Sequence, residues 1–227
     1  MNIAIDGPAG AGKSTIAKLV AAKLKSVYVD TGAMYRAMAL FLLKKGIAPE
    51  DADSITSVCD EADITIVYQD GVQHVILNGE DVTGGLRTEK VGNMASKSSG
   101  NKAVREKLVK LQQKLASETS VVMDGRDIGT VVLPDAEVKI FLTASAKVRA
   151  ERRHQELLQR ASAEEKSLVP SVETIERDIE ERDYRDSHRA ESPLKQADDA
   201  VLVDSSYMSI EEVASEILKI AGEKSEG

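Results

Sequence analysis

The sequence predicts an α/β fold in which a doubly wound, five-stranded parallel sheet carries helices on both faces. Short apolar runs alternate with longer segments of helical periodicity, a glycine-rich loop joins the first run to a helix, and polar residues follow several runs directly. Because right-handed crossovers bring the ends of parallel strands to one edge of the sheet, we expect these polar residues to form a ligand site there.

Five apolar segments are predicted to be the strands of this sheet, because each is short and followed by polar or turn residues. They cover residues 2–6, 27–29, 121–123, 138–142 and 200–203. After the first segment, apolar side chains recur at spacings of three and four, which predicts a helix; they are Ile16, Leu19, Val20 and Leu24.

The loop between the first strand and this helix has the composition of a phosphate-binding loop. Its glycines let backbone N–H groups approach an anionic oxygen at the positive end of the helix dipole. Lys13 adds a mobile charge, Ser14 is the residue type that P-loop proteins place on nucleotide-bound magnesium, and Thr15 extends the polar rim. An ordinary glycine-rich turn is the alternative, but this pattern is rare by chance. The loop comprises Gly7, Pro8, Ala9, Gly10, Ala11, Gly12, Lys13, Ser14 and Thr15.

One segment interrupts the alternation of strands and helices. Residues 64–68 and 72–77 alternate in polarity around Asp70-Gly71, and a second turn at Asn78-Gly79 leads into residues 80–82. We interpret residues 63–102 as an inserted subdomain with a small antiparallel sheet, rather than as a decorative hairpin.

Composition limits the class of protein. The chain of 227 residues is long enough for one domain with an insertion, so residues 1–227 are interpreted as a single domain. A net charge of -8 argues against a nucleic-acid or membrane-surface binder. The single cysteine, Cys59, fits a reducing compartment and a buried position. We therefore expect a cytoplasmic protein.

Arginines gather on two segments that are predicted to be helices, although the protein is acidic. Such clusters suit polyanion binding, and the alternative is an exposed helix with i,i+4 ion pairs. Residues 149–170 include a polar stretch with few apolar anchors, which is typical of a lid over a nucleotide. The clusters are Arg149, Arg152 and Arg153, followed by Arg182, Arg185, Asp186 and Arg189 on one expected face.

Four runs of sequence together resemble bacterial cytidylate kinase. The P-loop is shared by many nucleotide-binding proteins, whereas the second and third runs and the position of the insertion are specific to this kinase type. The runs span nearly the whole chain and read IDGPAGAGKST from Ile5, DTGAMYR from Asp30, DGRDIGTVV from Asp124 and RDYRD from Arg182.

The resemblance implies transfer of the γ-phosphoryl group of ATP to CMP or dCMP, with Mg²⁺ bound together with ATP. Residues 63–102 would be the CMP-binding subdomain and residues 149–170 the lid. We expect a monomer that binds small-molecule nucleotides, and the acidic composition argues against nucleic acid or a membrane as partner.

The same resemblance assigns roles to individual residues. The acceptor phosphate would contact Thr31, Arg36, Arg126 and Arg189; the cytosine would contact Ser96, Arg105 and Asp127; the sugar would contact Tyr35, Arg182 and Asp186. Lys13, Arg126, Arg182 and Arg189 would be catalytic, and Arg153 would reach ATP from the lid. The alternatives are helix caps for Thr31 and Ser96, a core position for Tyr35, and an ion pair with Glu106 for Arg105.

Other nucleotide-binding proteins fit the sequence less well. A regulatory GTPase needs an N-K-x-D motif, and the nearest match, from Asn101 to Val104, lacks the aspartate. A kinase for shikimate or another nucleoside monophosphate would not explain the insertion, and a structural nucleotide-binding protein would not need two arginine-rich helices.

Overall fold

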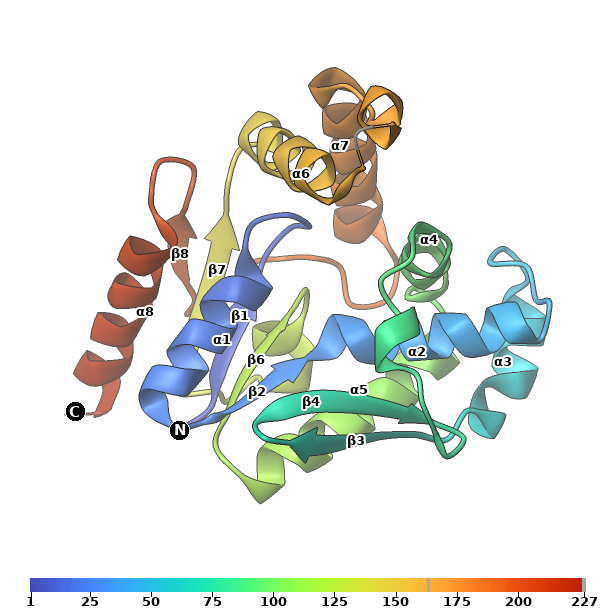
Figure 1. Ribbon diagram of the computed structural model, residues 1–227. Helices are drawn as coiled ribbons and strands as arrows, with labels where there is room; N and C mark the ends of the chain where they lie inside the picture. Colours follow the sequence, from blue (N-terminus) through green and yellow to red (C-terminus); the bar gives the residue numbers. More distant parts are fainter. Residues whose placement is uncertain (163, 226–227) are drawn as a thin grey trace.

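A computed structural model describes residues 1–162 and 164–225 and contains the predicted five-stranded parallel sheet (Figure 1). Its order is β2-β6-β1-β7-β8, and all four neighbouring pairs are parallel. The order reverses at β1, so the loop after β1 lies where doubly wound folds bind ligands. The strands are β1 (Ile3–Asp6), β2 (Val27–Asp30), β6 (Val121–Gly125), β7 (Val138–Thr143) and β8 (Val201–Asp204).

Helices cover both faces of the sheet, as predicted. On one face, α1 (Lys13–Leu24) and α8 (Ile210–Ser225) pack against Ile3 and Ile5 of β1. On the other face, α2 (Thr31–Lys44) and α5 (Lys102–Glu118) pack against Ala4. Successive residues of β1 thus enter opposite cores, which explains why this strand is apolar throughout.

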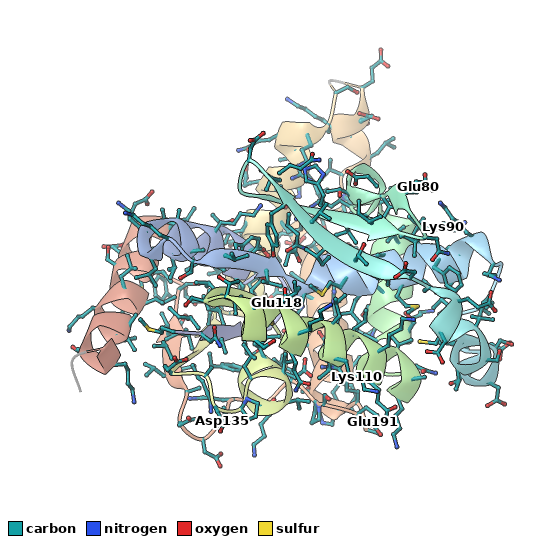
Figure 2. All side chains as sticks on the ribbon, turned by 90° about the horizontal axis from the view of Figure 1, so that it is seen from below. Glu80, Lys90, Lys110, Glu118, Asp135 and Glu191 are labelled. Atoms are coloured by element: carbon teal, nitrogen blue, oxygen red, sulfur yellow. The ribbon has the colours of Figure 1, made fainter. Side chains whose placement is uncertain are left out.

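The outer side of α5 is solvated. The view from below shows α5 across the underside of the molecule, with exposed Lys110 and Glu118 on its outer side (Figure 2). Asn101 caps the start of this helix, because its side-chain oxygen accepts hydrogen bonds from the N–H groups of Ala103 and Val104. The segment that most resembled a GTPase base-reading motif is therefore a helix start.

The insertion forms its own antiparallel sheet, as predicted, from β3 (Ile64–Gln69), β4 (Val72–Leu77) and β5 (Glu80–Asp81). The two expected turns explain its register, because Asp70-Gly71 and Asn78-Gly79 all have positive φ. The short helices α3 (Ala52–Val58) and η1 (Cys59–Glu61) precede the insertion, and η2 (Thr83–Gly85) and α4 (Glu89–Ser98) complete it. Cys59 is buried, as expected.

Beyond the carboxyl ends of the strands, α6 (Ala146–Arg160) and α7 (Val172–His188) pack side by side, joined through η4 (Glu165–Leu168) (Figure 1). The expectation of one shared arginine face on α7 is wrong in one respect, because Arg189 follows the last helical residue. Arg185 is exposed and lies 3.9 Å from Glu181, although its charge also acts on Arg182. Within the described residues, no helix is long and apolar enough to cross a bilayer.

Candidate active site

The P-loop (residues 7–15) runs from β1 into α1 with Gly7, Gly10 and Gly12 at positive φ. A Cβ on Gly7 would lie 1.9 Å from the carbonyl oxygen of Leu142, so glycine alone lets the loop pass this close to β7. Among the described residues, no side chain caps the start of α1, which leaves that helix end suited to an anion.

Lys13 points back into the P-loop. Its Nζ donates a hydrogen bond of 2.7 Å to the carbonyl oxygen of Pro8, and the residue is only 6% exposed. Burial, with the nearby charge of Arg126, holds the pKa of Lys13 well below its ordinary value. A phosphate group in the loop would supply the negative charge that this buried amine needs.

Ser14 and Asp124 lie side by side next to the P-loop. The Ser14 hydroxyl donates a hydrogen bond of 2.9 Å to Oδ2 of Asp124, whose Oδ1 accepts one of 2.8 Å from the Tyr28 hydroxyl. Burial, with the negative charge of Asp30, raises the pKa of Asp124. A hydroxyl and a carboxylate at this place fit magnesium, which P-loop proteins hold with a Ser or Thr and an aspartate from a neighbouring strand.

No role was assigned to Asp124 from the sequence, although the residue stood in one of the four runs. The available signal was its place as an acidic residue near the end of a buried strand. Pairing of β6 with β1 places Asp124 opposite Ile5, directly before the P-loop. Strand order was needed to recognise this neighbour.

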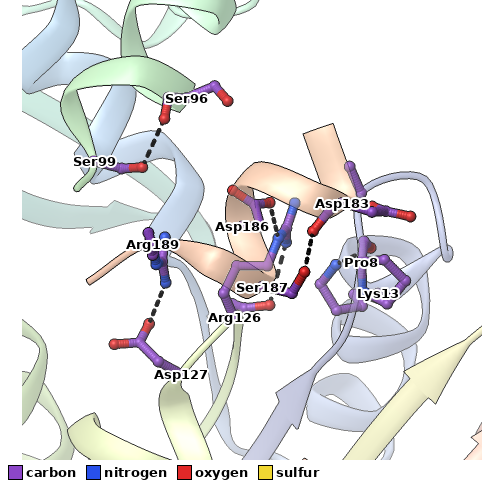
Figure 3. Close-up of polar contacts among 12 residues, drawn as sticks. Pro8, Lys13, Ser96, Ser99, Arg126, Asp127, Asp183, Asp186, Ser187 and Arg189 are labelled. Carbon is purple, nitrogen blue, oxygen red and sulfur yellow. Dashed lines mark hydrogen bonds and ion pairs between the residues drawn. The ribbon is translucent and has the colours of Figure 1, made fainter. Parts of the chain in front are cut away.

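A second cluster contains Arg126 and Arg189, two of the arginines expected to meet the acceptor (Figure 3). Arg126 Nε lies 3.0 Å from Oδ2 of Asp186, and Arg189 Nη2 lies 3.8 Å from Oδ1 of Asp127. Although burial alone would raise the pKa of Asp186, the charges of Arg126 and Arg182 lower it. Arg126 and Asp186 thus hold each other in place between the end of β6 and α7.

Arg182 and Arg189 each keep a buried donor that makes no hydrogen bond among the described residues, although Arg189 also forms the ion pair with Asp127. These donors are Nε of Arg182 and Nη2 of Arg189. Burial, followed by repulsion from Arg126, lowers the pKa of Arg182 to about 10. Buried polar atoms are normally hydrogen-bonded, so these donors indicate a place for an anionic ligand.

Arg105 and Asp127 form a buried ion pair between α5 and the turn after β6. The guanidinium lies 5.3 Å from the ring centre of Tyr35, and its Nη1 donates 3.1 Å to the carbonyl oxygen of Ser99. The alternative of an Arg105–Glu106 pair is wrong, because Glu106 faces Lys102 instead. Arg105 and Asp127 therefore offer a ligand a guanidinium and a carboxylate side by side.

Ser96 and Tyr35 add two hydroxyls to this part of the site. Neither hydroxyl has a hydrogen-bond partner among the described residues, although both oxygens are buried and the Gln112 amide lies near Tyr35. Burial raises the pKa of Tyr35 to about 12. Ser96 lies inside α4, so it is not a helix cap.

Thr31 and Arg36 lie on the first turns of α2, but in different situations. The Thr31 hydroxyl donates 2.7 Å to the carbonyl oxygen of Asp124, so contact with a phosphate requires exchange of this bond. Asp30, not Thr31, caps the helix through the N–H of Ala33. Burial lowers the pKa of Arg36.

Asp6 fixes the turn that carries Arg126 and Asp127. Its two carboxylate oxygens accept backbone hydrogen bonds of 2.8 Å from Ile128 and 2.7 Å from Gly129, at the start of the π-helical turn η3 (Ile128–Val132). Burial raises the pKa of Asp6 to about 6, against the effect of these two bonds. Sequence reasoning gave this residue no role, and its buried place at the end of a strand was the only signal.

The lid arginines differ in their surroundings. Arg149 is buried and donates 2.9 Å to the carbonyl oxygen of Ala9 in the P-loop and 2.6 Å to Asp183 of α7. Arg152 donates 2.6 Å to the carbonyl oxygen of Ser205. Arg153 is exposed and pairs only with Glu156 at 2.8 Å among the described residues, so its side chain is the least restrained of the three.

Comparison with known proteins agrees with this geometry. The family model for cytidylate kinase matches residues 3–223. The chain belongs to the cytidylate kinase family. A cytidylate kinase from Carboxydothermus hydrogenoformans is 48% identical over 226 residues, which cover 100% of this chain and 99% of that protein. A cytidylate kinase from Caldicellulosiruptor bescii is 50% identical over 220 residues, covering 97% and 95%.

Membership of the cytidylate kinase family makes the chain an enzyme, a nucleotide-binding kinase. A shikimate kinase from Bacteroides thetaiotaomicron shares the fold, with a TM-score of 0.50, 11% identity and 98% of each chain covered. This likeness concerns the P-loop kinase fold alone.

Proposed function

We propose that the chain transfers the γ-phosphoryl group of ATP to the phosphate of CMP or dCMP, giving CDP or dCDP and ADP. The observation that carries the proposal is the buried Arg105–Asp127 pair beside the arginine cluster, on the acceptor side of a P-loop. We propose that its partners are small-molecule nucleotides and that it acts as a monomer in the cytoplasm.

The P-loop would hold the ATP phosphates through its backbone N–H groups and Lys13. Ser14 and Asp124 would hold magnesium, which when bound neutralises charge on the β- and γ-phosphates. Arg149 already contacts the carbonyl of Ala9, so it would keep the lid base against the loop. Arg153 would reach the ATP phosphates when residues 149–170 close and exclude water.

The Arg105–Asp127 pair would select cytosine. The exocyclic amino group of cytosine donates to a carboxylate, while its O2 and N3 accept from a guanidinium or a hydroxyl such as that of Ser96. Uracil presents an oxygen where cytosine presents the amino group, and this oxygen would face Asp127. A buried mismatch of this kind costs about 1–3 kcal/mol.

Phosphoryl transfer needs little covalent help from the protein. The acceptor phosphate, with a second pKa near 6, is already a nucleophile at neutral pH; its oxygen forms the new bond to the γ-phosphorus while the bond to the β,γ-bridging oxygen breaks and ADP leaves. Arg126, Arg182 and Arg189 would offset charge on the transferring group and hold the acceptor in line. Thr31 and Arg36 would add contacts to the acceptor phosphate, and Tyr35 and Asp186 would hold the sugar with Arg182.

Separation of products after incubation with Mg-ATP and CMP tests the proposal. CDP and ADP should appear in equal amounts, and no ADP should form when CMP is omitted. Formation of ADP without CDP would show an ATPase and contradict the proposal, as would full recovery of both substrates.

A further inference from the structure

A cavity of about 760 Å³ separates the insertion from the outer edge of the sheet. Its wall comes from α1, β2, the start of α2 and the hairpin of β3 and β4. Across this space, polar side chains of the insertion reach β2. These side chains are hydrogen-bonded to β2, so the cavity lies at a contact between the insertion and the sheet.

The strand β2 lies at the edge of the sheet, and side chains of the insertion form hydrogen bonds with its free backbone edge. Val27 donates its N–H to Ser120, on the side of β6, so the backbone groups of Tyr28 and Asp30 point outward. The Gln73 amide pairs with both backbone groups of Asp30: Oε1 accepts from the N–H at 2.8 Å and Nε2 donates to the carbonyl at 3.1 Å.

A second contact comes from Tyr68, which is paired with Gln73 in the hairpin and reaches β2 two residues before Asp30. The Tyr68 hydroxyl donates 3.1 Å to the carbonyl oxygen of Tyr28, so two side chains of the hairpin hold alternate residues of β2. Gln69, on the same hairpin, is exposed and makes no comparable side-chain bond among the described residues.

Asp30, the residue held by Gln73, connects several parts of the acceptor side. Its Oδ1 caps α2 by accepting 3.0 Å from the N–H of Ala33, and its Oδ2 lies 3.2 Å from Nη2 of Arg87 in the insertion. Because α2 begins at the next residue, the position of Asp30 determines where the first turns of α2 present Tyr35 and Arg36.

We propose that Gln73 is a positioning residue for the acceptor nucleotide: its amide fixes Asp30, and through the cap of α2 it aligns the acceptor-binding side chains. This inference rests on the proposed function, because the acceptor roles of Tyr35 and Arg36 belong to it. Loss of a purely structural residue would lower stability and affect the KM values for CMP and ATP alike. Loss of a positioning residue should raise the KM for the acceptor and leave the KM for ATP unchanged.

The test is Gln73→Glu, which keeps the size and the acceptor of the side chain but loses the donor to the Asp30 carbonyl. The matched control is Gln69→Glu, with the same change of charge on the same hairpin. Steady-state kinetics should give a KM for CMP raised ~10-fold in Gln73→Glu and a KM for ATP within about twofold of wild type. Gln69→Glu should match wild type in both.

Two results would overturn the inference: an unchanged KM for CMP in Gln73→Glu, or an equal rise for CMP and ATP. If Gln73→Glu does not fold, Gln73→Met removes both hydrogen bonds without adding charge and should give the same separation of the two KM values. Failure of the proposed function appears differently, as absence of CDP with the wild-type enzyme, and would overturn both.

Discussion

Arg126 and Asp186 form an ion pair with 3.0 Å between Nε and Oδ2, which joins the turn after β6 to the last turns of α7. The proposed function gives the two residues different parts of the same ligand, the phosphate for Arg126 and the sugar for Asp186. Their contact means that removal of either side chain also releases the other, so effects on phosphate and sugar binding are coupled.

Asp186→Ala should raise the KM for CMP and lower kcat/KM for CMP more than for dCMP. The carboxylate is proposed to accept from ribose hydroxyls, one of which dCMP lacks, so CMP should lose more. Kinetics with both acceptors check this, with Asp178→Ala, an exposed carboxylate of α7, as the control. Unchanged selectivity would remove Asp186 from the sugar site.

Lys13→Ala should lower kcat by about 100-fold or more, because a buried cation next to the transferring phosphate stabilises charge that develops in the transition state. The stability of the Lys13→Ala variant should differ little from that of wild type, because burial already disfavours the charged form of Lys13. Lys23→Ala, on the exposed side of α1, is the control. Wild-type kcat with unaltered Tm would exclude Lys13 from the reaction.

Arg153→Ala should raise the KM for ATP several-fold and leave Tm unchanged, because this side chain is exposed and pairs only with Glu156 among the described residues. Arg149→Ala should lower Tm, because it leaves Asp183 and the Ala9 carbonyl without a buried partner. Kinetics and thermal unfolding of both variants separate the roles. If Arg153→Ala bound ATP normally, the lid contact would have to come from another residue.

Asp6 makes stability depend on pH. Its folded-state pKa of about 6 exceeds the ordinary value of 3.8, so the folded state binds the proton more tightly than the unfolded state. Asp6 therefore adds roughly 3 kcal/mol to the free energy of unfolding when the pH is below 3.8. This contribution is lost as the pH rises through about 6.

Urea unfolding of wild type and Asp6→Asn without nucleotide, over about pH 4.5 to 7, checks this dependence. Wild type should lose stability relative to the variant across that range, because asparagine does not titrate. A constant difference between the two proteins would show that Asp6 does not titrate as described. Measurement without nucleotide avoids interference from the acceptor phosphate, whose own pKa lies near 6.

The sequence predicted those features that depend on local patterns. The apolar runs identified the strands, the glycine loop identified the phosphate site, and the Asp70-Gly71 turn identified the hairpin of the insertion. The partner of Ser14 was not predicted, because the approach of Asp124 depends on strand order in the folded sheet.

Residues that act through others were also missed. Asp6 and Gln73 bind backbone groups far along the chain, at Gly129 and Asp30, and no spacing in the sequence records such contacts. Arg105 was assigned through a family resemblance, but its burial against Asp127 is visible only in the structure. The prediction that Arg189 lies on the same helix as Arg182 was wrong, because helix periodicity does not show where the helix ends.

Turnover of five acceptors with Mg-ATP tests the central claim most directly. CMP and dCMP should be phosphorylated with kcat/KM values at least about 10-fold above those of UMP, AMP and GMP. Uracil and guanine present an oxygen to Asp127 where cytosine presents its amino group, and adenine lacks the O2 acceptor of cytosine. Turnover of AMP equal to that of CMP would contradict the account.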